Sequence, residues 1–156
     1  MKAFLSYSTT LDQIIALRLQ TMAAVYGIAS YVPPATTRQY DSPSLSVEVR
    51  QQLQGSDVVV AIVTHNPSAS ALSEMHWSVA ERKLLIPIIG PGVSPEHYSS
   101  FQPFFVVDPA DPSQAEGQIV QYLANMQQAQ TMNGALVALA TLSVALLVLG
   151  AVGSDS

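Results

Sequence analysis

The sequence predicts an α/β protein with a five-stranded, parallel, doubly wound sheet of strand order 2-1-3-4-5, followed by one C-terminal transmembrane helix. Short apolar runs alternate with amphipathic stretches over the first 130 residues, which is typical of parallel strands joined by helices. The run at 57–63 (DVVVAIV) is almost entirely apolar and rich in β-branched residues, like a strand covered on both faces. We therefore divide the chain into a domain, residues 1–130, and a membrane segment with a short tail, residues 131–156.

The first half of the domain is expected to contain two strands and two helices. The strands occupy residues 3–7 and 28–32, and the helix between them ends at Gly27. After a polar loop, Ser44 is the expected cap of a second helix that ends at Gly55.

The second half is expected to add three strands and two helices. The third strand is followed by a helix over 69–83 and by a buried strand at 84–89. A fifth strand is expected at 104–107. Asp111 is the expected cap of the last helix, with Pro112 in its first turn.

The predicted membrane segment is residues 134–153 (GALVALATLSVALLVLGAVG), which carry no charged side chain. A helix of about 20 residues matches the roughly 30 Å hydrocarbon core of a bilayer. A helix that is apolar all round either spans a membrane or is deeply buried, and the core of an oligomer is the alternative burial site. No long apolar run follows Met1, so we expect no secretory signal and place the N-terminal domain in the cytoplasm on a single-pass anchor.

Composition excludes several classes of function. Lys and Arg number 6 against 11 Asp and Glu, for a formal net charge of −5, and the basic residues are scattered. This balance argues against nucleic-acid binding, which needs a basic patch. The chain has no cysteine, which excludes disulfides, thiol nucleophiles and cysteine zinc sites.

A sheet of this order predicts where a ligand binds. Ligands of doubly wound sheets lie outside the carboxyl ends of the strands, where the strand order reverses. That rule brings residues 6–10, 32–43 and 64–74 around one cleft. The turn at 6–10 (SYSTT) has no glycine, which argues against a Rossmann fingerprint or a P-loop, and no G-x-S-x-G elbow is present.

Three motifs in this order and spacing resemble those of TIR domains. FLSYS at 4–8 is similar to the family's opening box, and SDVVVAIVT at 56–64 is similar to its third strand. In TIR enzymes a helical glutamate stands thirteen residues before the proline of a short I-P-I strand, and Glu74 stands thirteen residues before Pro87. The resemblance covers roughly residues 2–125 and is to divergent bacterial TIR proteins of antiphage systems such as Thoeris.

The resemblance implies an enzyme that cleaves the nicotinamide–ribose bond of NAD+, with Glu74 as the catalytic residue. NAD+ is then the substrate and no cofactor is required. The family also implies a homo-oligomer acting in antiphage defence, with a partner defence protein. The substrate-binding residues that it implies are Tyr7, Ser8, Thr9, Pro34, Ser68 and Ser70.

One carboxylate is chemically sufficient for this reaction. The nicotinamide of NAD+ is a cationic leaving group that departs neutral, so it needs no general acid, unlike the leaving groups of ordinary glycosidases. Positive charge develops on the ribose, where a fixed carboxylate stabilises it. Hydrolysis, cyclisation and base exchange are the outcomes open to the intermediate.

Two other interpretations stay open at this point. Glu74 also suits the first turns of a helix, where the helix dipole favours an acid. A TIR-like module without catalysis would act through self-association and its membrane helix, and this is favoured by Ser70 and Ser8, where the family often has Trp and Arg. No metal site is expected, because His65 and His76 stand eleven residues apart without a suitable carboxylate partner.

Overall fold

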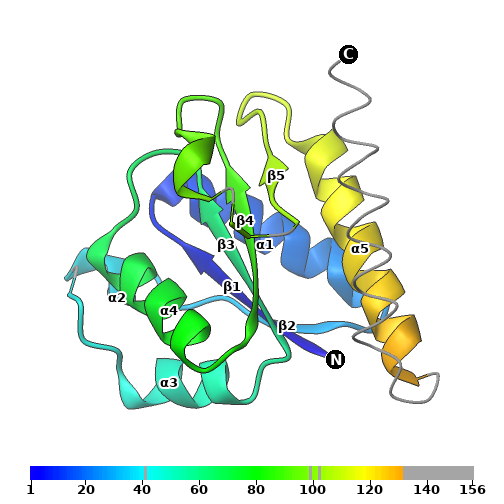
Figure 1. Ribbon diagram of the computed structural model, residues 1–156, viewed down its shortest axis with the longest axis horizontal. Helices are drawn as coiled ribbons and strands as arrows, with labels where there is room; N and C mark the ends of the chain where they lie inside the picture. The colour runs from blue at the N-terminus through cyan, green and yellow to red at the C-terminus, as the bar shows by residue number, and fades with distance from the viewer. Residues whose placement is uncertain (41, 99, 102, 132–156) are drawn as a thin grey trace.

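The computed structural model describes residues 1–131 except 41, 99 and 102, and it contains the expected sheet (Figure 1). All pairings are parallel, and the order is β2-β1-β3-β4-β5, so the predicted order 2-1-3-4-5 is confirmed. The strands are β1 (Lys2–Tyr7), β2 (Ala29–Tyr31), β3 (Val58–Val63), β4 (Leu84–Ile89) and β5 (Phe105–Val106).

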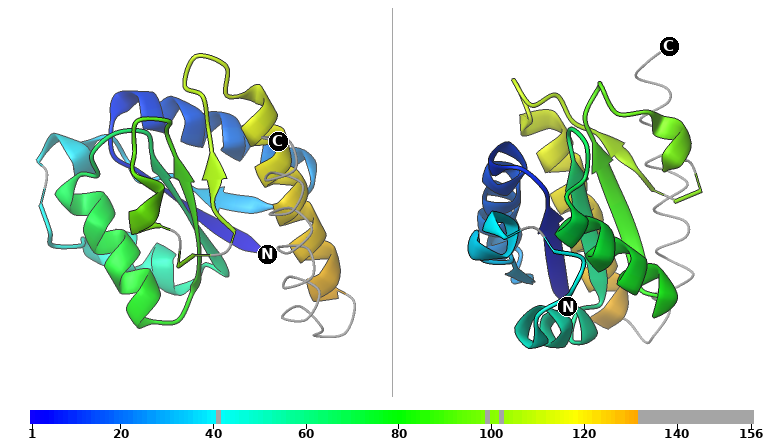
Figure 2. Two further views of the ribbon diagram at one scale, coloured as in Figure 1. Left: turned by 45° about the horizontal axis from the view of Figure 1, so that its top comes forward. Right: turned by 90° about the vertical axis from the view of Figure 1, so that its left-hand side faces the viewer.

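Helices cover both faces of the sheet, which makes the fold doubly wound. In Figure 2, α1 and α5 lie on one side of the strands, and α3 and α4 lie on the other. The described helices are α1 (Thr10–Val25), α2 (Thr36–Gln39), α3 (Val47–Gln54), α4 (Ala69–Ala80) and α5 (Ser113–Thr131), with a 3-10 turn, η1 (Pro95–His97).

The central strand β3 explains why its sequence is apolar without a break. Val58, Val60 and Ile62 pack in the hydrophobic cluster under α1 and α5. The residues between them pack in the second cluster, with Val49 of α3 and Met75 of α4. Since successive side chains of a strand point to opposite faces, both faces are buried and neither can be polar.

Several predicted boundaries need correction. The cap of α3 is Ser46, which accepts a hydrogen bond from the backbone N–H of Val49 at 3.1 Å; Ser44 lies before it. Helix α5 begins at Ser113, and its first acceptor is the Pro112 carbonyl, so Asp111 lies before the cap position. Both errors are shifts of one to two residues where Ser, Asp and Pro compete for the same role.

The closing glycine of α1 is where the sequence places it. Gly27 has a φ of 72°, and its N–H donates to the carbonyl of Ala24. This left-handed conformation is one that glycine adopts without steric cost. The reversal sends the chain directly into β2, at the edge of the sheet.

A second glycine fixes the spacing of two strand ends. A Cβ built on Gly90 would lie 2.6 Å from the backbone oxygen of Thr64. The chain segments leaving β3 and β4 therefore approach each other more closely than any other residue allows. This contact lies at the carboxyl edge of the sheet, just beyond β3 and β4.

The predicted transmembrane helix, residues 134–153, lies outside the described residues. Among the helices that are described, none is both long enough and apolar enough to cross a bilayer.

Tyr122 of α5 supplies a first prediction about stability. Its side chain is fully buried, its hydroxyl has no hydrogen-bond partner among the described residues, and burial raises its pKa to about 12. An unpaired buried hydroxyl costs about 1–3 kcal/mol. Tyr122→Phe is therefore expected to leave the free energy of unfolding unchanged or to raise it, as measured by urea unfolding at pH 8.

The same residue predicts a dependence on alkaline pH. Between its ordinary pKa of 10.0 and about 12, the folded state keeps the phenol proton and the unfolded state loses it. The unfolding free energy therefore falls by about 1.4 kcal/mol per pH unit in that window. Tyr122→Phe should lose less stability between pH 10 and 12 than the wild type, and an equal loss would contradict the assignment.

Candidate functional site

Glu74 lies on the inner face of α4, which is the face that a helix normally fills with apolar residues. Its side chain is 1% exposed, and the buried residues one turn before and one turn after it are Ser70 and Ser78. The Ser78 hydroxyl donates to the Glu74 backbone carbonyl at 2.6 Å. Ser70, Glu74 and Ser78 thus lie four residues apart along the buried face of α4, in place of apolar residues. They put a carboxylate inside the protein at the edge of the sheet.

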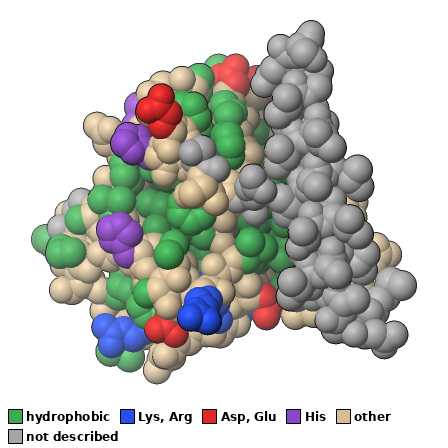
Figure 3. Space-filling model, in the orientation of Figure 1, with side chains coloured by type: hydrophobic (Ala, Val, Ile, Leu, Met, Phe, Trp, Pro, Cys, Tyr) green, Lys and Arg blue, Asp and Glu red, His purple; other side chains and the backbone are tan. Residues whose placement is uncertain are grey.

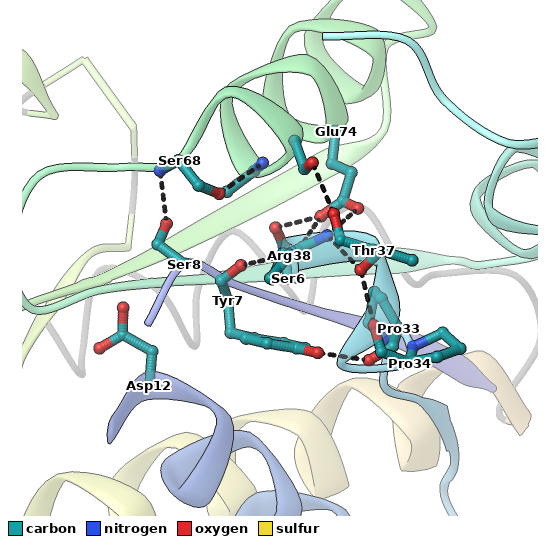
Figure 4. A network of polar contacts seen from close by, with 12 residues as sticks. Ser6, Tyr7, Ser8, Asp12, Pro33, Pro34, Thr37, Arg38, Ser68 and Glu74 are labelled. Carbon is teal, nitrogen blue, oxygen red and sulfur yellow. Dashed lines mark hydrogen bonds and ion pairs between the residues drawn. The ribbon is translucent and has the colours of Figure 1, made fainter. Parts of the chain in front are cut away.

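Arg38 of α2 neutralises this carboxylate. Its Nη2 lies 2.6 Å from Glu74 Oε1, and its Nη1 lies 2.9 Å from Oε2, so the pair is bidentate (Figure 4). The Arg38 side chain is 8% exposed. Two buried ions in this geometry compensate each other's loss of hydration, and removal of either leaves the other uncompensated.

Strand β1 completes the contacts of the pair. Ser6 points to the same side of the sheet as Phe4, toward α4, and its hydroxyl donates to Glu74 Oε1 at 2.6 Å. Arg38 Nε donates to the Tyr7 carbonyl at 2.6 Å, and its guanidinium carbon lies 4.5 Å from the centre of the Tyr7 ring. Burial raises the pKa of the Tyr7 hydroxyl, which the nearby Arg38 charge partly offsets.

The segment that carries Arg38, residues 33–40 together with Ser42, is tied to the sheet and to α4. The Tyr7 hydroxyl donates to the Pro33 carbonyl at 2.7 Å. The Ser70 hydroxyl lies 2.9 Å from the Thr37 carbonyl and 3.1 Å from the Ser42 carbonyl. The hydroxyls of Tyr7 and Ser70 therefore hold this segment over Glu74 through its backbone carbonyls, although the segment is not a strand of the sheet.

The other residues implied by the TIR resemblance lie around this cluster in different roles. Ser8 accepts a hydrogen bond from the Ser68 N–H at 3.0 Å, which joins the first strand turn to the start of α4. Ser68 caps α4, and Thr9 caps α1 in a capping box with Asp12. Pro34 is exposed, and its carbonyl accepts from Thr37. Tyr7 and Ser70 thus contact the segment that carries Arg38. Ser8, Thr9 and Ser68 instead make local contacts at the ends of β1, α1 and α4.

The space beside Glu74 is small. A cavity of about 110 Å³ is bordered by Glu74, Arg38 and Ser70 together with residues of the 40–49 stretch. Pockets for small ligands and cofactors usually measure about 300–1,000 Å³. In the described conformation the space beside Glu74 is therefore too small for a dinucleotide.

Two members of the site were not singled out from the sequence. Arg38 lies in the predicted polar loop before the second expected helix, and Ser6 lies within the FLSYS motif at 4–8. Arg38 is the only basic residue between Arg18 and Arg50. Its position in the loop after the second strand, at the expected cleft, is the sequence feature that would have suggested Arg38 as the partner of Glu74.

In the described part of the chain, no three His, Asp or Glu side chains lie close enough together to hold a metal ion. His65 and His76 do not contact Glu74 in any described interaction; they border a separate cavity.

Comparison with known proteins assigns this chain to no family. No protein-family model matches this chain, and no curated protein matches it significantly. The chain is an α/β protein with a five-stranded parallel sheet of the flavodoxin-like and TIR-like order 2-1-3-4-5.

Proposed function

We propose that the protein cleaves the nicotinamide–ribose bond of NAD+, with Glu74 as the catalytic residue. The observation that carries the proposal is a buried carboxylate at the carboxyl edge of a parallel sheet, oriented by the Ser6 hydroxyl at 2.6 Å. A carboxylate fixed in advance and shielded from water stabilises a nearby positive charge far better than one in solvent. The spacing of Glu74 and Pro87, which resembles TIR enzymes, supports the same assignment.

In this mechanism Glu74 faces the ribose of the bound dinucleotide. As the bond to nicotinamide breaks, the electron pair leaves with the ring nitrogen, which becomes neutral. The ribose is left electron-poor, and the carboxylate stabilises that charge until water or another nucleophile attacks. Ser6 lies under Oε1 at 2.6 Å and keeps the carboxylate oriented after Arg38 has moved.

Arg38 makes the described conformation inactive, because it occupies both carboxylate oxygens. We propose that assembly of several copies moves residues 33–40, which carry Arg38, and releases Glu74. The sequence-predicted membrane segment, residues 134–153, would hold the copies in one plane with the domain in the cytoplasm, in a role in bacterial antiphage defence. Concentrating the domains in this way favours assembly without any new contact.

A second candidate function is a non-catalytic, TIR-like interaction module that acts through its membrane helix. The bidentate pair favours this candidate, because a carboxylate saturated by Arg38 and Ser6 is also what a purely structural buried acid requires. Its effect on membranes should then survive Glu74→Gln and disappear when residues 134–156 are removed.

The test is a time course of NAD+ with the full chain in detergent, over rising protein concentration, with the products identified by chromatography. The enzyme proposal expects NAD+ loss matched by nicotinamide, with a rate per chain that rises on assembly. No loss at any concentration, in samples shown to be assembled, would exclude the enzyme and leave the interaction module.

A further inference from the structure

A second and larger cavity lies on another side of α4. It measures about 840 Å³ and is bordered by the chain leaving β3, by α4, and by the loop between β4 and β5 that contains η1. This volume lies within the range of pockets that hold small ligands. Glu74 does not border it, so it is a different site from the one described above.

All three histidines of the chain border this cavity. His65 follows β3, His76 lies on α4 and His97 lies in η1, and all three are exposed. No Asp, Glu, Lys or Arg is among the described residues that border it. The cavity wall thus has no carboxylate to repel an anion, and each of its imidazoles carries at least one N–H that can donate to one.

The orientation of His65 is set by a chain of hydrogen bonds that starts in the core. Asp12 is fully buried, and its carboxylate accepts from the N–H and from the hydroxyl of Thr64. Because the Thr64 hydroxyl uses its one proton on Asp12, its oxygen must accept from His65 Nδ1 at 3.1 Å. Nδ1 is therefore the protonated nitrogen, and Nε2 has no partner among the described residues.

The free edge of His65 is therefore its Nε2. A proton bound there makes Nε2 a donor for a phosphate oxygen, and hydrogen bonds between such charged groups are among the stronger ones.

The remaining wall of the cavity is apolar and aromatic. Leu72 and Met75 of α4 border the cavity, and so do Tyr98 and Phe101 from the loop between β4 and β5. Figure 3 shows histidine side chains beside hydrophobic ones on this face. An apolar, partly aromatic wall next to a few polar donors suits a ligand that has a flat ring at one end and an anion at the other.

We propose that this cavity binds a nucleoside phosphate, with the base against Tyr98 and Phe101 and the phosphate against histidine side chains of its wall. The site does not depend on the NAD+ chemistry of Glu74. Helix α4 borders this cavity and also carries Glu74, so a nucleotide bound in the cavity would contact the helix that holds Glu74.

The test is calorimetric titration of the full chain in detergent with adenosine monophosphate, adenosine and inorganic phosphate. We expect one adenosine monophosphate per chain, and binding of adenosine and of phosphate that is at least about tenfold weaker, since each lacks one half of the contacts. The single variants His65→Gln, His76→Gln and His97→Gln identify which imidazole meets the phosphate, and the triple variant should weaken nucleotide binding at least about tenfold, the size of one charge-assisted hydrogen bond. All three side chains are exposed, so the variants should fold, and the fluorescence of Trp77 verifies it.

Two further variants separate this site from the first one. Glu74→Gln and the exposed Glu81→Gln should bind adenosine monophosphate as the wild type does. The proposal is overturned if the wild type binds no nucleotide, or if binding survives the loss of all three imidazoles. Adenosine or phosphate binding as tightly as the nucleotide would overturn it as well. Loss of binding in Glu74→Gln alone, in a sample whose Trp77 fluorescence shows it to be folded, would place the nucleotide at Glu74 and not in this cavity.

Discussion

The Glu74→Gln variant of the assembled protein is expected to release nicotinamide from NAD+ at least about 100-fold more slowly than the wild type. Glutamine has the same shape and can still accept from Ser6, but it carries no charge to stabilise the electron-poor ribose. Loss of one electrostatic contact to a transition state typically costs a factor of 10²–10³. Initial rates of nicotinamide release at saturating NAD+ measure the effect.

Glu81→Gln is the matched control for this variant. Glu81 is the C-cap residue of the same helix and is exposed, and it has no described contact with the Glu74 cluster. Its removal changes the net charge by the same amount and should leave the rate unchanged. A Glu74→Gln protein that is folded and turns over at the wild-type rate would refute the catalytic assignment.

The Arg38→Ala variant is expected to lose about 3–5 kcal/mol of unfolding free energy. The substitution leaves Glu74 as a buried carboxylate without its cation, and breaking a buried pair from one side has this cost. The loss should be measured by urea unfolding at neutral pH. Arg50→Ala, which removes an exposed arginine of α3, should change the stability by no more than about 0.5 kcal/mol.

A double variant tests whether the loss comes from the unpaired charge. In Arg38→Ala/Glu74→Gln no buried ion is left alone, so the double variant should be more stable than Arg38→Ala by itself. If Arg38→Ala costs less than 1 kcal/mol, or if Glu74→Gln adds a further loss to it, the pair does not hold the closed conformation.

The order of the sheet could be predicted because its strands carry their own signals. The continuous β-branched run of β3 and the I-P-I run of β4 match strands that are buried on both faces, and Gly27 ends α1 as its position indicates. The expected boundaries failed where several capping residues follow one another, as at Ser44 and Ser46. Helix α2 has four residues and no hydrophobic face, and so it has no periodic pattern to detect.

The sequence predicted where Glu74 lies in the fold, but not that its side chain is buried and paired with Arg38. The spacing to Pro87 singled out Glu74, and the rule for doubly wound sheets placed it near Tyr7 and the loop after β2. Its ion pair joins residues 36 apart in the chain, and its burial depends on how α2 folds over the sheet edge. A contact of that kind is set by tertiary packing, which leaves no pattern in the sequence around either residue.

The most direct test of the central claim is the release of nicotinamide rings by the assembled wild-type chain, offered NAD+ and NADH side by side. A fixed carboxylate with no general acid can expel only a leaving group that departs neutral. We therefore predict that the protein cleaves NAD+ and leaves NADH intact. Failure of the assembled chain to release nicotinamide from NAD+ would contradict the account, and cleavage of both dinucleotides at similar rates would contradict the mechanism that rests on Glu74 alone.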